Sequence, residues 1–124
     1  MDVVDSSAWL SYLAGDKNSG KFSKAIEDLD QLLVPSITLT EVFKTIFRQR
    51  DEEAALAVVA HMQQGKVVPL DSGLAIDAAS YGLAHKLPLA DSVIYATACK
   101  FDATLWTQDS DFKSLKKVRY YPKI

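Results

Sequence analysis

The chain has only one cysteine, Cys99, so it cannot form an internal disulfide, and a reducing compartment is the simplest expectation. Its first fifteen residues, MDVVDSSAWLSYLAG, have no basic start, and acids interrupt their apolar run, which argues against a signal peptide. No segment approaches the roughly 18 consecutive apolar residues that span a bilayer. We therefore expect a cytoplasmic protein with no membrane partner.

An excess of positive charge is also lacking. The chain has 14 Lys and Arg against 16 Asp and Glu, a formal net charge of −2. Because phosphate binding normally rests on an excess of Lys and Arg, this balance predicts no strong general affinity for nucleic acid. The argument weakens if bound cations neutralise a cluster of the acids.

Repeats, low-complexity tracts and linkers are absent as well, which predicts a single domain over residues 1–124. The hydrophobic content of 48% and charged content of 24% are typical of a globular chain. A chain of this length can bury a core without disulfides or structural metal.

What the sequence does contain is a series of short β-like runs separated by helical patterns. Strands are expected at 3–4, 32–35, 66–70, 104–107 and 118–121. Apolar residues at helical spacing predict helices over 21–33, 37–50, 52–64, 72–86 and 89–100. This alternation predicts an α/β fold, with a mainly parallel central sheet of about five short strands covered by helices on both faces.

Four acids occupy comparable places in this pattern. Asp5 directly follows the first strand, and Glu41 lies in the helix after the second. Asp91 lies in the first turn of the 89–100 helix, and Asp109 follows the strand 104–107. Because ligands of open parallel sheets bind beyond the carboxyl ends of the strands, we expect these four carboxylates to line one pocket.

Such a cluster is unfavourable by itself, because like charges raise one another's pKa and destabilise the folded state. A divalent cation would relieve this repulsion. The set contains no His or Cys, so it favours Mg²⁺, or Mn²⁺ in its place, over Zn²⁺. A metal ion of this kind activates water and stabilises charge on a phosphoryl oxygen, which indicates phosphodiester hydrolysis.

Further polar residues flank the four acids. Ser6 and Thr107 are candidates to hydrogen-bond the carboxylates. If a helix begins at Asp109, the side chain of Asp111 diverges from it by about 200°, so we assign Asp111 to a first helical turn. Lys44 and Arg48, three and seven residues after Glu41, are candidates to hold RNA phosphates; the alternative is an ordinary solvated helix face.

The segments VVDSSAWL, PSITLTEVFK, LPLADSVIYATA and LWTQDSDF, in this order, resemble the four conserved blocks of PIN-domain ribonucleases, in particular the small VapC-type toxins. The resemblance covers essentially the whole chain and implies a PIN-like three-layer α/β/α sandwich. It implies that Asp5, Glu41, Asp91 and Asp109 bind the metal. It further implies a Mg²⁺-dependent endoribonuclease that cuts RNA, forms a homodimer and is held inactive by a cognate antitoxin protein.

Each acid also has a purely structural interpretation. Asp5, Asp91 and Asp109 could cap helices, and Glu41 could form an exposed pair with Lys44. Capping alone, however, predicts no preference for one edge of the sheet. The four acids together therefore favour a site.

Two other functions compete with a nuclease. One is a phospho-acceptor receiver-like signalling domain, in which Asp71, at the end of the run KVVPL, would be the acceptor. Against it, the first strand ends in one acid instead of a pair, and the lysine near the last strand follows Pro122 instead of preceding it. The other is a non-catalytic PIN-like interaction module, which the presence of all four acids disfavours.

The remaining candidate side chains are assigned to structure. His61 and His85 are expected at the surface, and Cys99 is expected to pack as a small hydrophobe. Four aromatic residues have core-like helical spacing, with partner contact as the alternative for some of them: Trp9, Tyr12, Phe43 and Phe47.

Overall fold

The computed structural model describes residues 1–124 and contains one five-stranded sheet. The strands are β1 (Asp2–Val4), β2 (Leu32–Pro35), β3 (Lys66–Val68), β4 (Thr104–Thr107) and β5 (Val118–Tyr120). Their order is β3-β2-β1-β4-β5, and every neighbouring pair is parallel. The first strand therefore lies at the centre, and all strands present their carboxyl ends at the same edge.

Side chains alternate between the two faces of the sheet. Val3 and Leu105 belong to one hydrophobic core, whereas their neighbours Val4 and Trp106 belong to the other. In β2, Leu33 likewise faces the first core, while Leu32 and Val34 face the second. This two-residue period, with apolar residues in both phases, is what a parallel sheet needs when helices cover both of its faces.

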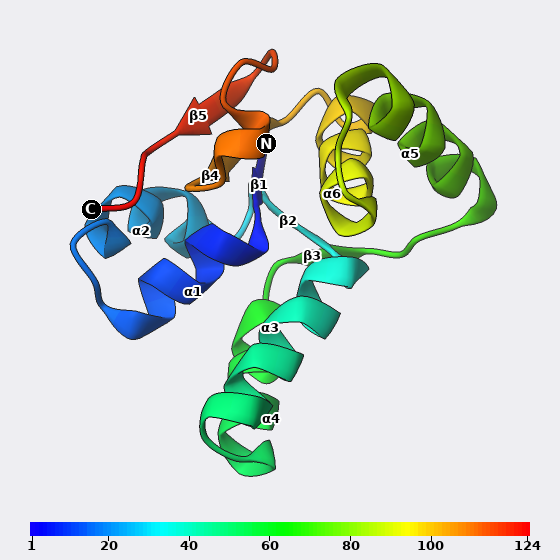
Figure 1. Ribbon diagram of the computed structural model, residues 1–124. Coiled ribbons are helices and arrows are strands. Elements are labelled where there is room, and N and C mark those ends of the chain that lie inside the picture. The colour runs from blue at the N-terminus through cyan, green and yellow to red at the C-terminus, as the bar shows by residue number, and fades with distance from the viewer.

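The helices form the two outer layers. On one side are α1 (Ser6–Ala14), α2 (Ser19–Glu27), α3 (Ser36–Gln49) and α4 (Glu52–Met62), and on the other α5 (Ser72–His85) and α6 (Leu89–Lys100). Figure 1 shows α5 and α6 packed together, and α3 and α4 as a hairpin that projects beyond the sheet. The predicted three-layer α/β/α sandwich is thus confirmed. None of its helices combines the length and apolarity needed to cross a bilayer.

The predicted helix over 21–33 is wrong at its end. Helix α2 stops at Glu27, where Asp28 leaves the helical conformation, and Leu29 is 43% exposed. Leu32 and Leu33 lie in β2 instead, where they enter opposite cores. The third strand also ends at Val68, two residues earlier than predicted, directly before Pro69.

Candidate functional site

A cavity of about 810 Å³ opens at the carboxyl edge of the sheet, and all four predicted acids line it. They come from four separate segments: Asp5 between β1 and α1, Glu41 in α3, Asp91 in the first turn of α6, and Asp109 after β4. The parallel arrangement produces this convergence, because each segment crosses or leaves the sheet at the same edge.

Asp5 is buried and held by three hydrogen bonds. One carboxylate oxygen accepts from the backbone N–H of Ala8 at 2.9 Å and from the hydroxyl of Ser7 at 2.8 Å. The other accepts from the hydroxyl of Thr107 at 2.7 Å. Asp5 therefore caps α1 and lines the cavity at once. Burial, which outweighs these hydrogen bonds, raises the pKa of its carboxyl to about 6.

The hydroxyl of Thr107 connects two of the acids. It donates to Asp5 and accepts from the backbone N–H of Asp109 at 2.8 Å. The carboxylate of Asp109 in turn accepts from the backbone N–H of Asp111 at 2.9 Å and caps the short 3₁₀ helix η1 (Ser110–Phe112). The end of β4 is therefore fixed in register with the start of α1.

Ser6 is the partner of Glu41. Its hydroxyl donates to a carboxylate oxygen of Glu41 across a 2.6 Å separation, between residues that are 35 positions apart in the sequence. This bond joins the first residue of α1 to α3 and orients Glu41 toward the cavity that both residues line.

Asp91 is the most strongly perturbed acid. Its pKa is raised to about 7, first by partial burial and then by the negative charges of Asp109, Asp5 and Glu41. A raised pKa at one or more of these carboxyls is what the sequence predicts for a metal-free cluster. Asp91 therefore senses the charges of the other three acids across the cavity.

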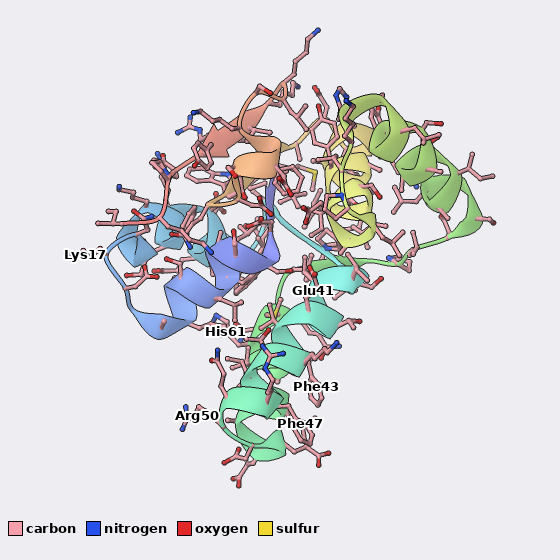
Figure 2. All side chains as sticks on the ribbon, in the orientation of Figure 1. Lys17, Glu41, Phe43, Phe47, Arg50 and His61 are labelled. Atoms are coloured by element: carbon pink, nitrogen blue, oxygen red, sulfur yellow. The ribbon has the colours of Figure 1, made fainter.

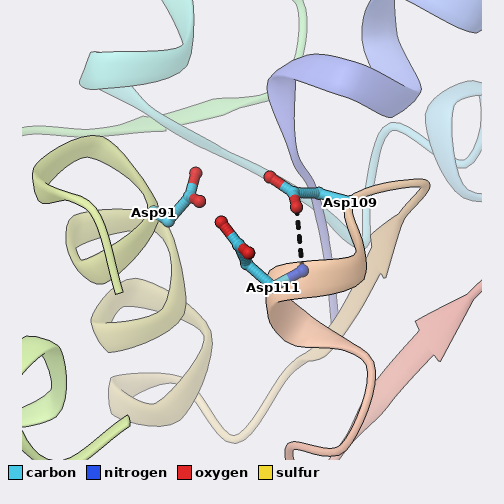
Figure 3. A group of neighbouring side chains, drawn as sticks. All are labelled: Asp91, Asp109 and Asp111. Carbon is cyan, nitrogen blue, oxygen red and sulfur yellow. Dashed lines mark hydrogen bonds between the residues drawn. The ribbon is translucent and has the colours of Figure 1, made fainter. Parts of the chain in front are cut away.

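Asp111 lies closer to the acids than we predicted. Although it is in the first turn of η1, one of its carboxylate oxygens lies within 4.8 Å of oxygens of both Asp91 and Asp109, and Figure 3 shows the three side chains together. The predicted 200° divergence fails because Asp109 has an extended backbone, with φ −84° and ψ 120°, and is not a helical residue. Asp111 is exposed and does not itself line the cavity.

The two predicted phosphate-binding cations point elsewhere. Lys44 and Arg48 line a separate shallow pocket with Phe43 and Phe47, and neither lines the acidic cavity. In Figure 2, Phe43 and Phe47 lie on the opposite side of α3 from Arg50. Of the two interpretations of Lys44 and Arg48, the structure favours the solvated helix face.

Three other cations line the cavity: Lys17, Arg50 and Lys123. Spacing from the acids does not identify them, because each lies at the end of an element or in a connecting segment. Sequence reasoning also missed Asn18, which is buried and donates to the side chain of Gln108 at 2.7 Å and to the carbonyl of Pro122 at 2.9 Å. An isolated Asn in a polar loop gives no signal of such a role.

The competing interpretations find little support in the geometry. Asp71 caps α5 through the N–H of Leu74, lies 3.9 Å from Lys100, and is remote from the cavity lining. His61 and His85 are exposed, as predicted. Trp9 is fully buried, whereas Phe47 is 46% exposed, so the aromatic residues divide between core and surface.

The donor set fits a hard divalent cation. All cavity-lining acids offer carboxylate oxygen, no His or Cys lines the cavity, and no ion pair neutralises any of the four acids. Burial, and then the charges of the other three acids, raise the pKa of Asp91, and a bound cation would offset this effect.

Comparison with known proteins places this geometry in a family. The family model described as PIN domain matches residues 3–118. Comparison with curated proteins finds no match.

Solved structures of similar fold cover nearly the whole chain. A chain of a toxin–antitoxin complex from Klebsiella pneumoniae superimposes with a TM-score of 0.82 at 19% identity, covering 99% of this chain and 100% of that one. VapC20 of Mycobacterium tuberculosis, described as a toxin that cleaves the sarcin–ricin loop, gives 0.78 at 22% identity, with 96% and 99% covered. DNA-bound VapBC from Salmonella typhimurium gives 0.73 at 19%, with 98% and 96% covered. These likenesses establish the fold.

Proposed function

Because the chain belongs to the PIN domain family, we propose that it is a Mg²⁺-dependent endoribonuclease and the toxin of a toxin–antitoxin pair, acting in the cytoplasm. One observation carries the proposal. Four carboxylates from distant segments line one cavity without an ion pair, although burial and the charges of the other three raise the pKa of Asp91. A structural role for these acids explains none of this convergence.

In the proposed mechanism, Asp5, Asp91 and Asp109 hold the ion. Mg²⁺, or Mn²⁺ in its place, would acidify a water molecule and offset the charge of the scissile phosphate. Glu41, oriented by Ser6, positions the attacking water or completes the coordination. Thr107 keeps Asp5 and Asp109 in register, and Asp111 adds negative charge beside Asp91 and Asp109.

The proposal also names the molecules that this protein binds. The substrate is RNA, and an antitoxin protein holds the nuclease inactive; in support, a chain of similar fold belongs to a toxin–antitoxin complex from Klebsiella pneumoniae. The protein itself forms a homodimer. In support, α5 and the start of α6 expose large apolar side chains that no element of the chain covers: Ile76 at 68%, Leu83 at 85% and Leu89 at 81%.

The purified protein should cut single-stranded or looped RNA in Mg²⁺ or Mn²⁺, and EDTA should abolish the cutting. Because water attacks, the downstream fragment should carry a 5′-phosphate; attack by the 2′-hydroxyl would leave a cyclic phosphate instead and would need a general base. End-group analysis of the fragments separates the two mechanisms.

A pair of Asp→Asn variants supplies the control. Asp91→Asn should lower kcat at least 100-fold, while Asp71→Asn, which alters an exposed carboxylate outside the cavity, should leave it unchanged. Cleavage that survives EDTA, cyclic-phosphate ends, or full activity in Asp91→Asn would each show that this mechanism is wrong.

A further inference from the structure

The cavity has a second, oppositely charged part. It extends from the four acids between α1 and the α3–α4 hairpin, where Leu10, Leu13, Ile46 and Val58 contribute apolar walls. Lys17, Arg50 and Lys123 line the same cavity. One continuous hollow therefore carries carboxylates and cations together.

These three cations have no acidic partner. The only ion pairs of the chain join Lys100 to Asp71 and Lys117 to Asp102, both outside the cavity. Asp16, which also lines the cavity, accepts instead from the hydroxyl of Ser11 and the N–H of Asn18. Although acids outnumber cations in the cavity lining, these three cations have no ion pair and are available to an anionic ligand.

The three cations come from different segments around the cavity, and Arg50 stands away from Glu41 along α3. Arg50 is the C-cap of α3, nine residues beyond Glu41, which corresponds to about 13 Å along a helix axis. Figure 2 places Arg50 toward the free end of the α3–α4 hairpin and Lys17 on the segment that joins α1 to α2. Lys123 follows Pro122, whose carbonyl accepts the hydrogen bond from Asn18.

We propose that Lys17 and Arg50, assisted by Lys123, bind phosphates of the RNA strand on one side of the scissile phosphate. This inference rests on the proposed nuclease function and adds residues that position the substrate. With a metal ion bound to the four acids, the acidic part of the cavity and the part lined by Lys17, Arg50 and Lys123 would both attract anionic groups. A ligand that is anionic at regular intervals along its length satisfies both, and a single nucleic-acid strand has this property.

An acidic peptide is the competing ligand for the cations. It would use Lys17 and Arg50 without needing a cation on the four acids. An RNA strand instead links the two parts of the cavity, so its binding should depend on metal and on the cations together. The continuity of the cavity favours the RNA strand.

The test compares two double variants of equal charge. Lys17→Ala/Arg50→Ala removes two groove cations, and Lys44→Ala/Arg48→Ala removes two cations from the opposite side of α3. Binding of a fluorescent single-stranded RNA is measured in Mg²⁺ over a series of salt concentrations, in a Glu41→Gln background that slows cleavage and keeps the three proposed metal ligands. All four side chains are exposed, and thermal melting verifies that each variant folds.

In the groove variant, Lys17→Ala/Arg50→Ala, the negative slope of log K against log salt should become shallower by about 0.7 for each cation removed, roughly 1.4 in total. Binding at low salt should weaken about tenfold for each cation. With Glu41 restored, KM for cleavage should rise while kcat stays close to that of the unmodified protein. The control variant should leave the slope and KM unchanged.

An unchanged slope in the groove variant, or an equal loss in the control variant, would overturn the inference. So would a groove variant that loses binding of an oligoglutamate peptide yet keeps RNA binding, because the cations would then serve the peptide. The proposed function fails separately: RNA that binds with the groove-dependent slope but is never cut contradicts the nuclease and leaves the groove assignment standing.

Discussion

At the scale of single residues, Asp5 shows that a structural and a chemical role can reside in one carboxylate. It receives three hydrogen bonds, including the N-cap bond of α1, and each of them favours the ionised form. Burial nevertheless raises its pKa to about 6. The same position that orders the start of α1 therefore holds a charge that the metal-free protein accommodates poorly.

Stability in EDTA should therefore depend on pH. The pKa values of Asp5 and Asp91 are raised to about 6 and about 7 from 3.8, so between these limits the folded state binds more protons than the unfolded state. Stability contributed by these groups is present below about pH 4 and is lost as pH rises to about 7. Asp91→Asn should consequently be about 1–2 kcal/mol more stable than the unmodified chain at pH 8, after allowance for solvent screening.

Urea unfolding in EDTA at pH 8 and pH 4 measures this difference. At pH 4 both chains carry a neutral side chain at position 91 and should unfold at nearly the same urea concentration. A stability gain of the same size at both pH values would mean that ionisation of Asp91 is not its cause.

At the scale of helices and strands, Asn18 joins three segments that the sequence keeps far apart. Its side-chain amide donates to Gln108, the residue before Asp109, and to the carbonyl of Pro122. Its backbone N–H donates to Asp16 in the same loop. Gln108 also donates to Ser7 through its backbone and side chain, so the loop after β4 is held against α1 from two directions.

Asn18→Ala should therefore lower both stability and activity. The substitution leaves the buried side-chain oxygen of Gln108 without its donor, which costs about 1–3 kcal/mol of unfolding free energy, and also frees the carbonyl of exposed Pro122. It should also lower kcat, because Asp109 follows Gln108 directly. Lys21→Ala removes an exposed donor to the side-chain amide oxygen of Asn18 and a cation–π contact with Tyr121, and should change both quantities much less. Equal unfolding midpoints for the two variants would contradict this role.

Most of the helices and strands could be predicted because their apolar residues recur at helical spacing or form short β-like runs. The five strands lie where short apolar runs predicted them, and four of the acids line the cavity as their places after strands indicated. The end of α2 could not be predicted from this pattern, since Leu32 and Leu33 satisfy a helical spacing as well as a two-faced strand. Only the tertiary structure decides between them.

The rotation of α3 about its axis could not be predicted from the sequence either. Residues three and four positions after Glu41 lie on opposite sides of it around the helix axis, and spacing alone cannot tell which side faces the groove. In the structure Thr45 and Gln49 line the cavity, whereas Lys44 and Arg48 face away. Packing of the α3–α4 hairpin against the core determines which side of α3 faces the cavity. The sequence around Glu41 does not indicate that side.

At the scale of the whole molecule, Mg²⁺ should stabilise the fold, because the complete cluster exists only in the folded state. At 100 times its Kd, a ligand specific for the folded state adds about 2.7 kcal/mol, which is several degrees in Tm for a chain of this size. Asp5→Asn, which retains a good capping residue, should reduce the Mg²⁺-dependent rise in Tm, whereas Asp71→Asn should retain it. Undiminished stabilisation of Asp5→Asn would exclude Asp5 as a ligand.

The central position of β1 also has a consequence for synthesis on the ribosome. This first strand pairs with β4, and Asp5 accepts a hydrogen bond from Thr107. The ribosome must therefore add about 100 more residues after β1 before this neighbouring strand exists. A nascent or truncated chain that stops before residue 104 lacks Asp109 and leaves one side of β1 open. Interrupted translation therefore yields fragments that lack one of the four carboxylates, and the complete cluster forms only late in translation.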